Sequence, residues 1–259
     1  MEAEEEKIVE HVKEAVHTLT DKKKNWKQKI GNFLWEILVI VIAVNLTIWF
    51  HNWNEKRHER ALEKEFLIGI RENLVVDTVI IRANINFYTN QPLVYYDSVI
   101  AQLKSNKINA QYVDSYVYQL INNNTPNYDY SIFQSFSSAG NLRLIENQNL
   151  LNDIMSLYST GLPFSERNIR EMYLWRQENF DKYIGTKIDM DFGENGVTSK
   201  LSTILHQPDV KYIIKAGRVF IFSTNSQNEF LITKIAAVIQ EINKELKDKF
   251  NVPVETKKA

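Results

Sequence analysis

Apolar residues dominate the stretch from residue 30 to residue 50, which reads IGNFLWEILVIVIAVNLTIWF and carries one charged side chain, Glu36. An α-helix rises about 1.5 Å per residue, so about 20 residues are needed to cross a hydrocarbon layer of roughly 30 Å. The pattern therefore predicts a transmembrane helix over 30–50. The alternative for such a run is a helix buried in the core of a soluble protein.

Tryptophans bracket this apolar run on both sides. They are Trp26, Trp35, Trp49 and Trp53. Amphipathic indole rings prefer the two membrane interfaces, whereas a soluble core helix needs no such bracketing. We therefore expect the segment to contact a lipid bilayer. A cleaved signal peptide fits poorly, because no small-x-small cleavage site follows the run.

Positive charges set the expected orientation. Before the run stand Lys22, Lys23, Lys24, Lys27 and Lys29, and after it stand Lys56 and Arg57. Lysine and arginine stay on the cytoplasmic side of a membrane, which predicts a cytoplasmic tail over residues 1–29. Within that tail, apolar residues at helical spacing between 2 and 19 predict a short amphipathic helix.

Four polar or small residues interrupt the apolar run and share one helix face at 100° per residue. They are Asn32, Glu36, Ala43 and Thr47. Such a membrane stripe lets helices approach and hydrogen-bond, and a carboxylate facing acyl chains is costly, so we expect a partner helix. Alternatively, Glu36 reaches the headgroups or is protonated.

A second helical pattern follows the apolar run and contains no proline before Pro92. Its apolar row recurs at a spacing near 3.5, which predicts a stalk helix over 51–91 that continues the transmembrane helix. The stalk row consists of Leu62, Phe66, Ile70, Asn73, Val76 and Ile80. It could pair with a second copy, with Asn73 fixing the register, or pack against later helices of its own chain.

Beyond Pro92 the chain is expected to form a multi-helix domain over 92–259, outside the cytoplasm, so that the fold class is mainly α. Helical periodicity predicts helices at about 93–104, 110–122, 131–139, 147–159, 163–184 and 226–249. Breaks are expected at Gly161 with Pro163 and over 185–199. The segment 211–224 could be a strand or a buried helix.

Composition and spacing give no catalytic, cofactor or metal site. The chain has 259 residues, no cysteine and a net charge of -1, which excludes disulfides and Cys-ligated zinc and argues against nucleic-acid binding. The five histidines are scattered, without the i, i+4 spacing of a helical metal pair. The acidic loop 189–196 has the composition of a calcium loop, but Lys200 stands where an EF-hand needs glutamate.

Two stretches resemble a family of uncharacterised single-span envelope proteins of Bacteroidota. The first runs from Trp35-Glu36-Ile37 through His51-Asn52-Trp53-Asn54-Glu55, and the second is similar to that family's Ser-Ser-Gly-x-Leu element at 136–145. The family usually has glycine where this chain has Trp35. The resemblance implies a bacterial inner-membrane location with a periplasmic helical domain, and it supplies no activity.

Three classes of function remain open. The leading hypothesis is a structural or accessory protein that forms a homo-oligomer or braces a larger envelope complex. The alternative is a periplasmic ligand sensor, although a tail over 1–29 has no room for an output domain, so a sensor would need a partner. An enzyme ranks third, because it would require an enclosed polar pocket with perturbed titratable groups.

Overall fold

The computed structural model describes residues 13, 26–120, 122–188, 190–193 and 196–253. These residues are mainly α-helical, which confirms the predicted fold class. The amphipathic helix predicted between 2 and 19 lies outside the described residues, apart from Lys13. The side chains of Lys27 and Lys29 are also not described.

The chain divides into two compact units, Met1–Leu62 (unit 1) and Glu63–Ala259 (unit 2). Helix α2 (Trp26–Tyr88, 63 residues) contributes to both, so the apolar run and the predicted stalk share one helix. The unit boundary differs from the predicted domain boundary at residue 92. The difference arises because residues from Glu63 onward bury side chains in the core of unit 2.

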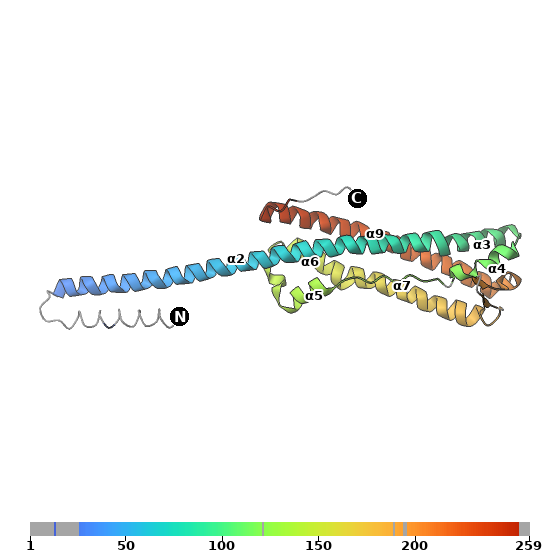
Figure 1. Ribbon diagram of the computed structural model, residues 1–259, viewed down its shortest axis with the longest axis horizontal. Coiled ribbons are helices and arrows are strands. Elements are labelled where there is room, and N and C mark those ends of the chain that lie inside the picture. The colour runs from blue at the N-terminus through green and yellow to red at the C-terminus, as the bar shows by residue number, and fades with distance from the viewer. Residues whose placement is uncertain (1–12, 14–25, 121, 189, 194–195, 254–259) are drawn as a thin grey trace. The chain divides into compact units, whose positions relative to one another are not determined.

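Three long helical runs form the framework of unit 2 among the described residues (Figure 1). The first continues α2 through η1 (Thr89–Leu93) into α3 (Val94–Ser105). The second joins α6 (Gln148–Ser156), η4 (Leu157–Gly161), α7 (Leu162–Arg176) and η5 (Gln177–Ile184). The third is α9 (Pro208–Phe250).

Two expected helix breaks are absent. The chain passes Pro92 in the π-helical turn η1, and it passes Gly161 and Pro163 through the π-helical turn η4 and the start of α7. A π turn widens the helix by one residue and can absorb the hydrogen bond that proline cannot donate. The helix breaks predicted before residues 93 and 163 were therefore wrong, because the helical run continues through both positions.

Shorter elements fill the connections. They are α4 (Ala110–Ser115), η2 (Val117–Leu120), α5 (Ser131–Ser138), η3 (Asn141–Leu144) and α8 (Leu201–Ile204). Within the loop predicted over 185–199, β1 (Asp191–Gly193) pairs antiparallel with β2 (Gly196–Thr198). The segment 211–224 lies inside α9, so the open choice between strand and helix is resolved in favour of helix. Burial of Ile213, Ile214, Gly217 and Ile221 at helical spacing explains why.

The first and third runs are antiparallel. Side-chain contacts join them at successive heights: Glu63 to Lys249, Thr89 to Asn225 and Asp97 to Arg218. The first of these is an ion pair with 2.7 Å between Lys249 Nζ and Glu63 Oε2, and Glu63 is buried. Glu146 also contacts Lys249 Nζ at 2.8 Å.

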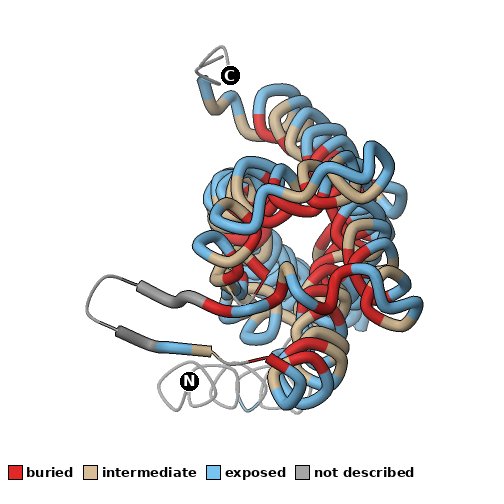
Figure 2. Tube along the Cα trace, turned by 90° about the vertical axis from the view of Figure 1, so that its right-hand side faces the viewer, coloured by how far each residue is buried: buried red, intermediate tan, exposed pale blue. Residues whose placement is uncertain are grey.

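Unit 2 buries two hydrophobic clusters, and Figure 2 colours the buried positions of the chain red. The first cluster extends to Leu162 on α7 and to Leu231 on α9. The second cluster extends to Ile169 on α7 and to Ile221 on α9. The buried side chains between them on these helices are polar. With two buried polar residues of α2 they make up what we call the polar layer: Asp77, Asn84, Ser165, Thr224, Asn225 and Asn228.

Candidate functional site

The membrane stripe lies on the part of α2 that belongs to unit 1. Asn32, Ala43 and Thr47 are exposed and Glu36 is partly exposed. Thr47 Oγ1 donates to the Ala43 carbonyl at 3.0 Å, so this hydroxyl is satisfied inside its own helix. Glu36 Oε2 has no hydrogen-bond partner in the described part of the chain. Glu36 is therefore the member of the stripe that most needs an outside partner.

The four bracketing tryptophans are all exposed, with between 52% and 73% of each side chain accessible for Trp26, Trp35, Trp49 and Trp53. The helix is long and apolar enough to cross a membrane, and none of its most apolar window is buried. The described chain therefore does not use this stretch as a core helix. One long apolar helix near the N-terminus is compatible with a membrane anchor.

The stalk row divides between the interior and the surface of unit 2. Phe66 and Ile70 are buried in the chain's own core, whereas Val76 is 57% exposed. Leu62 and Ile80 are partly buried, and Asn73 Nδ2 donates to the Asp129 carbonyl at 3.3 Å. For Phe66 and Ile70 the structure supports packing within the chain, the second of the two alternatives.

The buried face of α2 departs from the predicted row after Ile70. It follows Glu63, Leu67, Ile70, Leu74, Asp77, Ile81 and Asn84. The predicted row is shifted by one position there, because it counted the exposed Val76 as buried and ignored Asp77. Buried polar residues at positions 63, 77 and 84 keep a seven-residue spacing with Ile70, and this spacing is the sequence signal that could have revealed them.

A chain of hydrogen bonds crosses the polar layer from Tyr128 to α9. Ser165 Oγ donates to Asn228 Oδ1 at 2.7 Å. Tyr128 Oη lies 3.0 Å from Ser165 Oγ, and since the serine proton is already used, the tyrosine is the donor there. The Asn228 Nδ2 at the end of this chain has no partner among the described residues.

Asp77 is the buried carboxyl of the polar layer, with 1% of the residue exposed. Its pKa is raised from 3.8 to about 7. Burial is the main cause, the nearby Asp129 and Glu166 carboxylates add to it, and a backbone hydrogen bond from Asp129 opposes it. Its Oδ2 has no hydrogen-bond partner in the described chain. Such a group changes charge near neutral pH.

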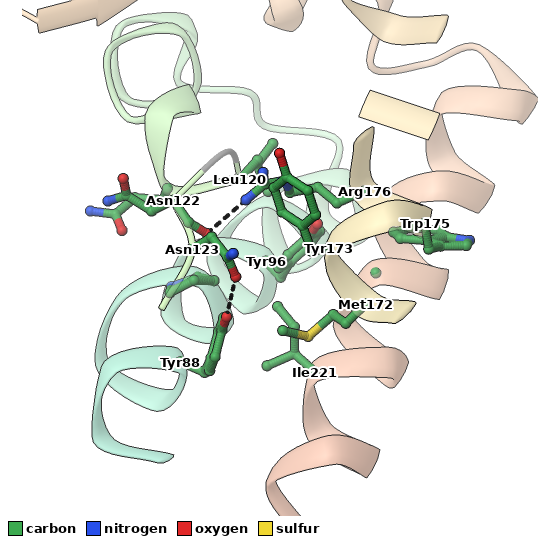
Figure 3. A pocket seen from close by; sticks show the side chains of 13 residues that line it. Tyr88, Tyr96, Leu120, Asn122, Asn123, Met172, Tyr173, Trp175, Arg176 and Ile221 are labelled. Atoms are coloured by element: carbon green, nitrogen blue, oxygen red, sulfur yellow. Dashed lines mark hydrogen bonds between the residues drawn. The ribbon is translucent and has the colours of Figure 1, made fainter. Parts of the chain in front are cut away.

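A small cavity lies where η2, α7 and the end of α2 meet (Figure 3). Tyr88 donates to Asn123 Oδ1 at 2.6 Å, and Arg176 Nη1 donates to the Asn122 carbonyl at 2.9 Å. Gln119 Oε1, and Nε of the same arginine, lack hydrogen-bond partners in the ranges described. With a volume of about 20 Å³ the cavity suits one water molecule that bridges such groups.

No sequence pattern predicted a functional role for Asp77, Ser165, Asn228 or Arg176. Each is a polar residue within a helical pattern, where a solvated position is the default reading. Among the described residues, no group of His, Asp and Glu is placed to hold a metal ion. No family model, curated protein or solved structure matches the chain.

Proposed function

We infer that this protein is a single-pass envelope protein that self-associates through its anchor helix and presents unit 2 as a structural or accessory module. The observation that carries the proposal is Glu36, a carboxyl group in an exposed apolar helix, with one oxygen that has no partner in the described chain. In lipid such a group costs at least a few kcal/mol unless another polar group pairs with it. A second copy of the same stripe supplies Asn32 and Glu36 for that purpose.

The orientation belongs to the same proposal. The lysines before the span place the N-terminus in the cytoplasm and unit 2 in the periplasm of a bacterial inner membrane. The resemblance to single-span Bacteroidota envelope proteins supports this location. A reporter enzyme that is active only in the periplasm, fused after Ala259, is expected to be active. Activity only in a fusion ahead of Met1 would reverse the topology.

The stripe is tested with single cysteines in membranes of cells that make the full chain. Ala43→Cys and Thr47→Cys should give strong disulfide-linked dimers, because both positions lie on the stripe. Asn45→Cys is the matched control, since Asn45 Nδ2 already donates to the Val41 carbonyl at 2.7 Å and the residue lies about 160° from Thr47. Equal crosslinking at all three positions, or none, contradicts the stripe.

The stalk row is not part of this proposal. Phe66 and Ile70 are already buried within unit 2, so they have no free surface for a second copy. Self-association therefore rests on the membrane stripe. The partner complex, if a larger one forms, is to be found by gentle solubilisation, affinity purification and mass spectrometry.

A further inference from the structure

A groove of about 390 Å³ runs between α7 and α9 on the surface of unit 2. These helices lie side by side in Figure 1 and are in contact. On α9 the lining extends from Ser223 to Lys234, roughly 16 Å along the helix axis. The volume falls in the range of small-molecule sites, and the length favours an extended ligand over a compact one.

The walls of the groove are apolar and open to solvent. Phe164 on α7 is 39% exposed and Phe230 on α9 is 62% exposed, while Leu231 is buried between the helices. Gly161 lets Leu231 pack closely at one end of the groove, because a Cβ there would lie 3.0 Å from Leu231 Cδ1. Exposed aromatic rings on two facing helices are surface that a hydrocarbon chain would cover.

The charge of the lining has one sign. Lys234 is its one charged residue, and no carboxylate lines the groove. The Lys234 ammonium lies 5.0 Å from the centre of the Phe230 ring, so the side chain leans back by one turn over that ring. A cation at the edge of an apolar groove favours a ligand with an apolar body and an anionic head.

The floor of the groove is formed by buried polar residues. Ser165 and Asn228 line it, and both are at least nine-tenths buried. Tyr128 donates to Ser165, and Ser165 donates to Asn228 Oδ1, so a chain of buried hydrogen bonds fixes this floor. The Asn228 Nδ2 is shielded from solvent, so a ligand in the groove would take its charged contact from Lys234.

We propose that this groove binds a single-chain amphipathic carboxylate, the chemistry of a free fatty acid. The hydrocarbon chain lies between Phe164 and Phe230, and the carboxylate accepts a hydrogen bond from Lys234. A second protein chain fits less well, because a stable protein interface needs about 800 Å² from each partner, far more than a narrow groove offers. The site is independent of self-association through the membrane stripe.

The test uses the full chain in lipid nanodiscs and a photoreactive dodecanoate that carries a diazirine at the end of its chain. Mass spectrometry after illumination should locate the label in peptides that contain residues 160–168 and 223–234. Label in residues 30–50 measures simple partitioning into the bilayer. An excess of unlabelled dodecanoate should remove the label from the groove, whereas dodecylamine should not. Label confined to 30–50, or equal competition by the amine, overturns the proposal.

Matched variants separate the groove from the rest of α9. Lys234→Gln should lower groove labelling about tenfold, because a charge-assisted hydrogen bond is lost, whereas Lys244→Gln, exposed on the same helix outside the groove, should leave it unchanged. Phe230→Ala should also reduce labelling, and Phe222→Ala, with a ring that is similarly exposed at 54%, should not. Equal labelling of both members of each pair would show that the groove is not the site.

Discussion

The two halves of α2 are one continuous helix but differ in which side chains they bury. Between residues 30 and 50 the helix is mostly apolar and exposed, and its few polar side chains bond to their own helix or have no described partner. From Glu63 to Tyr88 one face is buried, yet that face contains Glu63, Asp77 and Asn84, while Val76 is exposed. Burial therefore follows the surroundings of the helix rather than the hydrophobicity of each residue.

The largest expected effect is on the pH dependence of stability, and it comes from Asp77 on the buried face of α2. The folded chain holds the Asp77 proton more tightly than the unfolded chain, so stability should fall as pH rises from about 4 to about 7 and stay constant above. Asp77→Asn, which cannot ionise, should be more stable than the wild type at pH 8 by about 4 kcal/mol and similar to it at pH 4. Urea unfolding followed by circular dichroism in nanodiscs measures the difference.

A surface carboxylate provides the control for this experiment. Asp153 is exposed on α6, and Asp153→Asn should keep the wild-type pH profile. A wild-type protein whose stability is the same at pH 5 and pH 8 would show that Asp77 does not titrate in this range.

The next effect compares two aliphatic residues of the stalk row. Ile70 is fully buried, so Ile70→Ala should cost about 3 kcal/mol in the free energy of unfolding. Val76 is exposed, and Val76→Ala should cost under about 0.5 kcal/mol. Both values come from the same urea titration. A large effect of Val76→Ala, together with loss of self-association, would restore the stalk row as an interface.

A charge placed on each half of α2 tests the difference in surroundings directly. Ile42→Asp should raise the free energy of membrane insertion of residues 30–50 by about 3 kcal/mol, measured in a host membrane protein. Val79→Asp should leave the fold of unit 2 nearly unchanged, because Val79 is 63% exposed. If Ile42→Asp inserted as well as the wild type, the case for a lipid-facing helix would fail.

The smallest effect concerns Asn73, which was predicted to fix the register between two copies. Its amide instead donates to the Asp129 carbonyl within unit 2. Asn73→Leu should therefore lower stability by under about 1 kcal/mol and leave the oligomeric state unchanged in native mass spectrometry. A change of oligomeric state would support the register role.

Much of the fold was predictable because helical periodicity extends over long stretches of the chain. The mainly α class and a continuous helix through residues 30–88 were both predicted. Pro92 and Gly161 misled the prediction, because a π turn can carry a helix past a residue that usually ends one. The polar layer was missed for a different reason. Asn228 is buried only because groups from distant helices surround it, and no local window contains that information. Asp77 follows the seven-residue spacing of Glu63 and Ile70, which the predicted row did not use.

The ion pair between Glu63 and Lys249 also has a mechanical consequence. It joins the residue where α2 enters unit 2 to the last turn of α9, so both lie at the same end of an antiparallel pair. A pulling force applied through α2 and through the residues after α9 would load this end first. The contacts between the two helices would then break sequentially, one turn after another, and not all at once in shear. The buried salt bridge lies at the loaded end, so it is among the first contacts between α2 and α9 to carry that load.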